Sequence, residues 1–419
     1  MNILSLLKTG KCSCGRTHEC DIESVIIESG AIKRLSELCE KYRKILIVAD
    51  ENTLRAAGDA VISSLSSKEI SRVIFPASPL LIPNEQAIER VEEALCESEL
   101  ILGVGSGVIQ DLCKYVSHFN NIPYMIVATA PSMDGYASTG AAMILQGMKV
   151  TVPAGLPRAI ICDTEVLKNA PSEMIKAGYG DIIGKYSALS DWKLSNIING
   201  EYLCDYIYSL TYKMVEKTLA CAEGLLRRDE KAVGTLAEAL IVVGIMMSFA
   251  GSSRPASGSE HHLSHFFEIV GIVKDEPYLP HGIDVAYSTV MTAALREKLL
   301  NADFNAKRYR LSRTEYEKKM SDIYGKVADG CISLQDKIGN YSADRMSIYK
   351  EKEKEIKKLL SEMPSAKEIE KMLSRCEMNI SEFYSVYGKE KIDTALLYSK
   401  DLKDRYTVLW LAYDLGLGI

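Results

Sequence analysis

Strand-length apolar runs that alternate with helical segments are the feature that most limits what the N-terminal part of this chain can fold into. The runs lie at 44–50 (KILIVAD), 72–75, 100–104 and 124–129. An unbroken apolar run is typical of a strand that is buried on both faces. Strands separated by helices form right-handed βαβ units and therefore a parallel sheet. We predict an α/β fold for this part of the chain.

The pattern changes after the fourth run. A hairpin that turns at Gln146-Gly147 is predicted at 142–152, and another strand at 159–163. From Ser172 onward the periodicity is helical. We therefore predict two domains, an α/β domain over 1–170 and an all-α domain over 171–419. Within the first, Thr53 and Asn84 are expected to cap the helices that follow them.

A glycine-rich turn, GVGSG at 103–107, follows the third predicted strand and precedes a helix that carries Asp111 and Lys114. Glycines let backbone amides approach a pyrophosphate, and the helix N-terminus adds a favourable dipole. Such turns also serve as plain tight connections, but this position favours phosphate binding. The turn is not GxGxxG, and it follows the third strand instead of the first.

Two other polar sites follow strands. Asp50, at the end of the first strand, is suited to accept hydrogen bonds from an adenosine ribose and would disfavour a 2′-phosphate, which favours NAD over NADP. The alternative is an ordinary helix-flanking aspartate. The loop TAPSMDGYAS at 129–138 follows the fourth strand. Ligands of open α/β sheets bind at the carboxyl ends of the strands.

Histidines concentrate in one short stretch. The chain has six, and four of them lie between residues 254 and 284: His261, His262, His265 and His281. His261 and His265 are four residues apart and share a helix face, whereas His262 points elsewhere. His281 follows Pro280 at a predicted helix start. Two imidazoles and a carboxylate commonly hold a divalent cation. The alternative, scattered solvent or capping histidines, fits this clustering less well.

Asp181 is the candidate third ligand. It lies within GYGDIIGK at 178–185, among glycines and apolar residues of a predicted buried helix. A carboxylate in such surroundings must be paired or bind a cation.

The cysteines give a second, weaker metal signal. Three of the eleven lie near the N-terminus beside a histidine, as Cys12, Cys14, His18 and Cys20. They could form a small zinc knuckle, but the spacing is tighter than CxxC and favours a structural turn or hairpin. The other eight are scattered, which is typical of reduced thiols in a cytoplasmic protein.

Charge and hydropathy argue against a nucleic-acid-binding or membrane protein. The formal net charge is −6, which argues against nucleic acid or an anionic membrane as partner. No run of 18 apolar residues is present, so no transmembrane helix is expected, and the N-terminus lacks a convincing signal peptide. Residues 306–376 are rich in Lys, Glu and Tyr, and we predict a solvated helical excursion, a lid or a dimer element. A last amphipathic helix is predicted at 404–415.

Four motifs carry a family resemblance: GVGSGVIQD, TAPSMDGYAS, GYGDIIGKYSALSDW and RPASGSEHHLSH with PHGID. With them, the chain resembles the iron-containing alcohol dehydrogenase and dehydroquinate synthase superfamily. Within that superfamily it is most similar to the bacterial sn-glycerol-1-phosphate dehydrogenases. The resemblance departs at Val104, where many relatives have glycine, and in the long charged stretch after Ala306.

The resemblance implies a nucleotide-binding α/β domain and an all-helical metal domain. The metal ligands would be Asp181, His261 and His281, with zinc, nickel or iron as the ion. Asp134 would contact the substrate, and His265 would lie beside it as the candidate proton relay. The NAD or NADP contacts would be Asp50, Gly105, Ser106, Gly107, Asp111, Thr129, Ser132 and Ser138.

The implied reaction is reversible hydride transfer between a nicotinamide and dihydroxyacetone phosphate, which gives sn-glycerol 1-phosphate. Arg254, Lys185 and residues 257–259 are unranked candidates for the substrate phosphate. The expected assembly is a cytoplasmic homo-oligomer, with a dimer favoured. The alternatives are a 3-dehydroquinate-synthase-like lyase, a glycerol dehydrogenase acting on an unphosphorylated polyol, and a non-catalytic binding protein.

Overall fold

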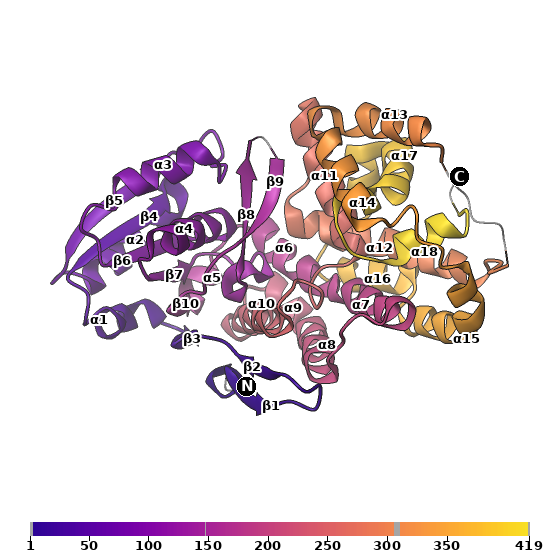
Figure 1. Cartoon of the computed structure of the whole chain (residues 1–419). Helices are drawn as coiled ribbons and strands as arrows, with labels where there is room; N and C mark the ends of the chain where they lie inside the picture. The colour runs from indigo at the N-terminus through magenta and orange to yellow at the C-terminus, as the bar shows by residue number, and fades with distance from the viewer. Residues whose placement is uncertain (1–2, 147, 306–310, 418–419) are drawn as a thin grey trace. The chain divides into compact units, whose positions relative to one another are not determined.

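The computed structural model describes residues 3–146, 148–305 and 311–417, and its chain forms two compact units (Figure 1). The first unit comprises Met1–Ile182 and Glu216–Ser252, and the second comprises Ile183–Val215 and Ser253–Ile419. Within the described residues, no strand follows Asp163, in line with the predicted change to helix. The first unit also takes in residues 216–252, which the sequence had placed in the helical half.

A six-stranded parallel sheet forms the centre of the first unit. Its strands, in spatial order, are β3 (Ser24–Glu28), β10 (Ala159–Asp163), β7 (Tyr124–Ala128), β6 (Leu100–Gly105), β4 (Lys44–Asp50) and β5 (Glu69–Phe75). The five predicted strands are confirmed. The edge strand β3 was not predicted, because it is short and largely unburied. The glycine-rich turn therefore follows the fourth strand of this sheet, and its placement after the third was wrong.

The two faces of the sheet are covered by different helices. In β4, Ile45 and Ile47 pack in the same cluster as residues of α2 (Glu51–Ser64), whereas Leu46 and Val48 pack with α3 (Glu85–Glu93) and α4 (Gly107–Asn120). All four side chains are fully buried. Each contributes about 1.5–3 kcal/mol by burial, which explains why the strand is apolar throughout.

Helix caps in the first unit are partly as expected. Asn84 caps α3 by accepting a hydrogen bond from the amide of Ala87. The cap of α2 is Asp50, and the prediction of Thr53 was wrong. Thr53 occupies the third helical position, where its hydroxyl accepts from the Asp50 amide. Asp50 and Thr53 are three residues apart and form one reciprocal capping box. Both residue types are common N-caps, so the sequence alone did not show which of the two occupies the N-cap position.

The first unit has further elements outside this sheet. They are a hairpin of β1 (Lys8–Lys11) and β2 (Thr17–Glu19), a hairpin of β8 (Gly140–Leu145) and β9 (Met148–Pro153), α1 (Leu35–Leu38), α5 (Thr164–Leu167), α6 (Ser172–Ile183), α9 (Ala222–Leu226) and α10 (Glu230–Ala250). The predicted hairpin at 142–152 is confirmed, although Gly147 lies outside the described residues. Helix α10 is long and apolar enough to cross a membrane, but 78% of its most apolar window is buried, as in a core helix.

The second unit is helical. Its elements are α7 (Lys185–Asn199), most of α8 (Asp205–Ala220), α11 (Ser259–Lys274), α12 (His281–Leu300), α13 (Arg313–Tyr324), α14 (Ala328–Ile338), α15 (Met346–Glu362), α16 (Ala366–Ser374), α17 (Ser381–Tyr398) and α18 (Val408–Asp414). Helices α15 and α16 pack against α12.

The predicted solvated excursion is wrong for the described part of 306–376, because one face of it is buried. Tyr349, Ile356 and Ile369 are fully buried there, and the charged side chains cover the other face. Residues 306–310 lie outside the described part of the chain. The last helix is shorter than predicted: it begins at Val408, after the cap residue Thr407, and it is buried as expected.

Candidate active site

Three of the predicted nucleotide-binding residues lie at the carboxyl ends of adjacent strands of the parallel sheet. Strands β7, β6 and β4 are neighbours, with Gly105 paired to Ala128 and Val104 paired to Ala49. Asp50, Gly105 and Thr129 therefore end or follow adjacent strands. The chain moves from β4 outward to β5 and then returns to β6, so the strand order reverses between β4 and β6. Such a switch point is where open α/β sheets bind ligands.

The close approach of α4 to its strand requires glycine at position 105. A Cβ atom there would lie 2.5 Å from Cβ of Ile109. Val104, the departure from the family pattern, is fully buried in the cluster that includes α2, so its side chain lies in the core. Ser106 precedes α4 as its N-cap. The first turn of a helix presents amides that lack intrahelical partners, which suits an anion.

Asp50 serves as a helix cap. Its Oδ1 accepts hydrogen bonds from the amides of Asn52, at 2.8 Å, and Thr53, at 2.9 Å. Oδ1 of Asp50 thus has the role expected of an ordinary helix-flanking aspartate. Its position at the carboxyl end of β4 remains suited to a ribose.

Asp111 and Ser138 meet a lysine that sequence reasoning had not assigned. The Nζ atom of Lys114 is fully buried and donates to the carbonyls of Gly135, at 2.9 Å, and Gly140, at 2.8 Å. It also lies 3.3 Å from Asp111 Oδ1 and 3.3 Å from Ser138 Oγ. Burial lowers the pKa of Lys114 and raises that of Asp111, and the attraction between them opposes both shifts. This group fixes the loop that begins at Thr129.

Asp181, on helix α6, contacts the same loop. Gly178, one turn earlier in α6, packs so closely that a Cβ atom would lie 1.8 Å from the Pro131 carbonyl oxygen. Asp181 is fully buried, and its Oδ2 accepts from the Asp134 amide at 3.0 Å. The first unit thus brings together Asp181, Asp134 and the loop that contains Ser132.

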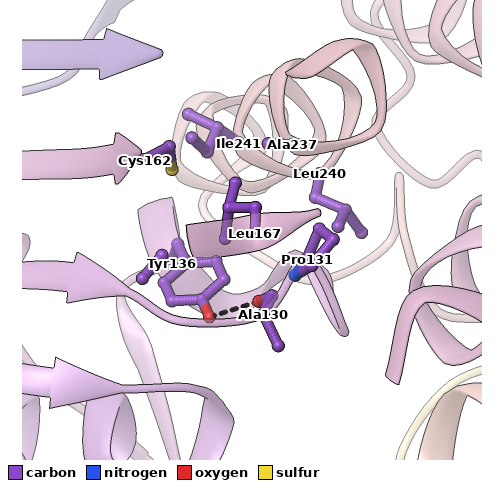
Figure 2. A pocket seen from close by; sticks show the side chains of 9 residues that line it. Ala130, Pro131, Tyr136, Cys162, Leu167, Ala237, Leu240 and Ile241 are labelled. Carbon is purple, nitrogen blue, oxygen red and sulfur yellow. Dashed lines mark hydrogen bonds between the residues drawn. The ribbon is translucent and has the colours of Figure 1, made fainter. Parts of the chain in front are cut away.

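An apolar pocket lies beneath this loop, but it offers little for a polar ligand. Its lining residues come from β7, the loop after it, β10, α5 and α10, and Figure 2 shows their side chains. The Tyr136 hydroxyl donates to the Ala130 carbonyl at 2.8 Å. Burial raises the pKa of Cys162 to about 12, so this residue stays a thiol. We regard the pocket as part of the core.

Three histidines cluster in the second unit. Ring centroids of His261 and His281 are 5.1 Å apart, those of His265 and His281 are 5.6 Å apart, and those of His261 and His265 are 6.0 Å apart. A ring nitrogen of His261 and one of His281 lie within 4.8 Å of each other. The arrangement follows from two helix starts, since His261 lies in the first turn of α11 and His281 is the first residue of α12.

Two of these rings are oriented by a contact at Nδ1. Nδ1 of His261 lies 2.7 Å from Oε1 of Glu260, and Nδ1 of His281 lies 3.3 Å from the hydroxyl of Ser264. An imidazole held through Nδ1 coordinates a metal through Nε2. Burial raises the pKa of Glu260. Sequence reasoning did not assign Glu260, although its place beside His261 was a signal.

His262 is not part of this cluster of histidine rings. It is fully buried, and its pKa is well below the ordinary value, first because of burial and then because of the positive charges of Lys403, Arg405 and Arg254. A neutral core imidazole is the result.

Asp191 holds the start of α11. Its Oδ2 accepts from the Ser259 amide at 2.6 Å, and its Oδ1 accepts from Arg296 Nη2, at 2.7 Å, and from the Val408 amide, at 2.9 Å. Asp191 and Arg296 are both buried. Four helices therefore meet at one carboxylate that the sequence did not identify, because its partners are far away in the chain.

Two of the candidate phosphate-binding groups, Arg254 and residues 257–259, have defined contacts. Arg254 is buried and paired with Glu201, and its Nη1 donates to the Tyr406 carbonyl. Ser259 Oγ lies 3.0 Å from Ser187 Oγ. Arg405, which the sequence did not suggest, donates from Nη1 to the Ser257 carbonyl at 3.0 Å, and its Nε makes no hydrogen bond within the described residues.

Comparison with known proteins places this geometry in a family. Residues 26–171 match the family model for iron-containing alcohol dehydrogenase. A glycerol-1-phosphate dehydrogenase [NAD(P)+] of Halalkalibacterium halodurans is 30% identical over 418 residues, 97% of each chain. Proteins with the same name are 33% identical in Geobacillus thermodenitrificans, over 69% of this chain and 72% of the relative, and 36% identical in Metallosphaera sedula, over 60% and 73%.

Solved structures support the fold. Glycerol dehydrogenase from Schizosaccharomyces pombe has a TM-score of 0.61 at 16% identity and covers 94% of this chain and 88% of its own. NADH-dependent butanol dehydrogenase A from Thermotoga maritima has a TM-score of 0.58 at 16% identity and covers 96% and 92%. The predicted fold class is confirmed. By the likeness of its sequence along most of its length, the chain belongs to the glycerol-1-phosphate dehydrogenases, within the iron-containing alcohol dehydrogenase family.

Proposed function

We propose that this protein is an NAD(P)-dependent oxidoreductase that reduces dihydroxyacetone phosphate to sn-glycerol 1-phosphate, reversibly. The observation that carries the proposal is the triangle of imidazoles at the starts of α11 and α12, within a chain related to glycerol-1-phosphate dehydrogenases. A carbonyl reduction needs a group that polarises the carbonyl, a hydride donor and a proton source.

The proposed metal ligands are Asp181, His261 and His281, in agreement with their ligand types and with the hydrogen bonds that orient both rings. The nitrogen and oxygen ligand set admits zinc, nickel or iron. A divalent ion bound there would act as a Lewis acid on the substrate carbonyl, and this is worth several kcal/mol.

The chain's own groups position the reactants. Asp134 donates its amide to Asp181 and is proposed to contact the substrate through its side chain. His265, half-buried beside both ligand histidines, is proposed to pass a proton to the product oxygen, directly or through a water. The nicotinamide supplies the hydride when it is bound.

The proposed nucleotide site follows the sheet edge. The amides around Gly105, Ser106 and Gly107 are suited to the pyrophosphate, and Thr129 and Ser132 lie in the loop after β7. Asp111 and Ser138 contribute through Lys114, which holds the loop.

The variant Asp50→Gly tests the ribose contact. We expect the ratio of kcat/KM for NADPH to that for NADH to rise at least about tenfold, because the variant removes repulsion between a carboxylate and a 2′-phosphate. Glycine is itself a tolerated N-cap, so stability should fall by only a few tenths of a kcal/mol. The matched control is Asn84→Gly, which alters the cap of α3. An unchanged cofactor ratio in Asp50→Gly would remove Asp50 from the site.

We further propose Arg405 as a ligand of the substrate phosphate, since its guanidinium adjoins residues 257–259 and adds to the positive charge around α11. The variant Arg405→Met should lower kcat/KM for dihydroxyacetone phosphate about 10- to 100-fold, because a charge-assisted hydrogen bond is worth about 1.5–3 kcal/mol. Activity on dihydroxyacetone should be unaffected. Arg375→Met, at an exposed site, is the control. Equal losses on both substrates would assign Arg405 a structural role.

The compartment and assembly remain proposals. No disulfide joins any of the cysteines within the described residues, which agrees with a cytoplasmic enzyme. The homodimer stays a prediction, and light scattering of the purified chain decides it.

A paired assay tests the proposed reaction. NADH oxidation should proceed with dihydroxyacetone phosphate and be slower by at least about 100-fold in kcat/KM with dihydroxyacetone, because the phosphate contact is lost. Comparable rates would instead indicate a glycerol dehydrogenase. No net NADH consumption with either substrate would contradict both assignments and favour lyase chemistry.

A further inference from the structure

A second group of metal-binding side chains lies in the N-terminal hairpin of the first unit. Strands β1 and β2 are joined by a tight turn in which the Cys12 amide donates to the Arg16 carbonyl and the Gly15 amide donates to the Cys12 carbonyl, both at 2.9 Å. Gly15 has a φ of +85°, a backbone conformation that residues with a side chain rarely adopt. The turn thereby folds Cys12 and Cys14 back toward His18, the second residue of the three in β2.

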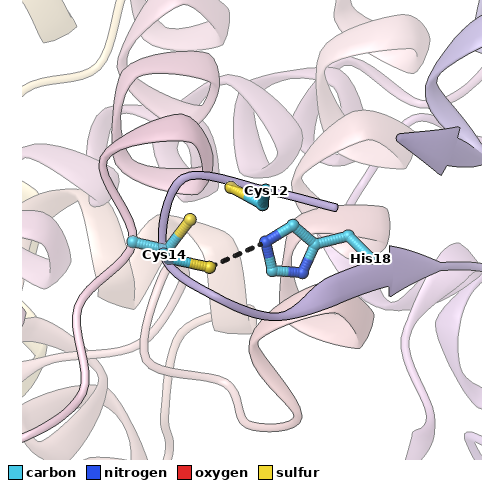
Figure 3. Close-up of side chains that lie close together, drawn as sticks. Cys12, Cys14 and His18 are labelled. Atoms are coloured by element: carbon cyan, nitrogen blue, oxygen red, sulfur yellow. Dashed lines mark hydrogen bonds between the residues drawn. The ribbon is translucent and has the colours of Figure 1, made fainter. Parts of the chain in front are cut away.

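The three ligand atoms converge (Figure 3). Those of Cys12, Cys14 and His18 lie within 4.8 Å of one another, and Cys14 Sγ is 3.4 Å from His18 Nε2. Tetrahedral zinc with bonds of about 2.1–2.3 Å places its ligand atoms roughly 3.3–3.8 Å apart. The pair Cys14 and His18 already has this separation, and Cys12 needs to close by at most roughly 1–1.5 Å.

The imidazole is held in place by the body of the first unit. His18 is only 1% exposed, and its ring stacks on Phe249 of α10, with centroids 5.2 Å apart and planes 19° apart. Both cysteines are partly exposed, so an ion can reach them. A fixed ring beside two accessible sulfurs is a built site, more than a chance meeting of mobile side chains.

The neighbouring Cys20 does not share this chemistry. It is buried, and its sulfur is not among the ligand atoms that lie within 4.8 Å of one another. Cys20 therefore provides a natural control within the same hairpin.

We propose that Cys12, Cys14 and His18 bind a thiophilic divalent cation, Zn²⁺, in a structural site that is separate from the proposed catalytic one. Binding converts the two thiols to thiolates and releases their protons to solvent, with no redox change. The remaining tetrahedral position takes water or a further ligand. Because the ion joins the turn to a ring packed on α10, it would stabilise the hairpin against that helix.

Cobalt(II) substitution is the direct test, because only sulfur ligands give the intense near-ultraviolet charge-transfer absorption and the proposed catalytic ligands contain no sulfur. The reduced, metal-stripped full chain is titrated with Co²⁺ alone. We expect the band to saturate by two equivalents, since the proposed catalytic site also binds Co²⁺, and to disappear in Cys12→Ser and in Cys14→Ser. It should persist in Cys20→Ser, in Ser13→Ala and in His261→Ala.

Zinc content provides the second readout. Cys14→Ser should lose one equivalent of Zn²⁺ per chain and keep NADH oxidation, whereas His261→Ala should keep this equivalent and lose the divalent ion of the proposed catalytic site together with activity. No sulfur-to-cobalt band in the wild-type protein, or a band that survives Cys14→Ser, would overturn the proposal. So would a stable disulfide between Cys12 and Cys14 in protein purified under reducing conditions. None of these three results bears on the proposed reaction.

Discussion

The variant His261→Ala is expected to fold normally, to lose the divalent cation of the proposed catalytic site, and to lose at least about 1,000-fold in kcat with dihydroxyacetone phosphate. His261 faces His281 at the junction of α11 and α12 and is oriented by Glu260. Removing it leaves too few ligands to hold the ion. The lost electrophilic stabilisation is several kcal/mol, and each 1.36 kcal/mol is a factor of ten in rate. Metal analysis and NADH oxidation measure the two losses.

The matched control for this prediction is His118→Ala, which removes an exposed histidine near the end of α4. It should retain both metal and rate. If His261→Ala kept its full metal content and turnover, the ligand set would be wrong. If it kept the metal and lost turnover, His261 would be reassigned from ligand to proton transfer.

The second large effect is on stability. Asp191→Ala should lower the free energy of unfolding of the second unit by about 3–5 kcal/mol, because it leaves the Arg296 guanidinium buried beside no carboxylate. It also removes the acceptor of the Ser259 and Val408 amides. Urea unfolding followed by tryptophan fluorescence measures the change, and Trp192, one residue along α7, is a local probe.

An exposed ion pair serves as the comparison for Asp191. Asp336 pairs with Arg313 at 2.5 Å, but both side chains are more than half exposed. Solvent screening should limit the effect of Asp336→Ala to about 1 kcal/mol or less. If both variants lost the same free energy of unfolding, burial would not explain the contribution of the Asp191–Arg296 pair to stability. Loosening of the α11 start in Asp191→Ala should also weaken metal retention.

The sheet was predictable because its signals are local. Strand β4 is apolar over its whole length, since one set of its side chains packs with α2 and the alternate set packs with α3 and α4. Strand β3 was missed because it lies at the edge of the sheet and only Ile26 is buried. The stretch after residue 310 was misjudged because its buried face consists of widely spaced single residues amid many charges.

The same distinction governs the candidate site. The spacing of His261 and His265 and the proline before His281 are local patterns, and the rings do cluster. What sequence could not provide was the partner of each charge. Arg254 carries the charge expected of a phosphate ligand, but its guanidinium is paired with Glu201, which lies far away in the sequence from the motif around Arg254. Lys114 holds the loop after β7 through carbonyl groups that no local pattern links to it.

The measurement that tests the central claim most directly is a metal titration of turnover. Cys14→Ser protein, in which the hairpin cannot compete for metal, is stripped with a chelator and titrated with Zn²⁺, Ni²⁺ or Fe²⁺ while NADH oxidation with dihydroxyacetone phosphate is followed. We predict negligible turnover without metal and a rise to a plateau at one equivalent per chain for at least one of these ions. Full turnover by the metal-free protein would contradict the account.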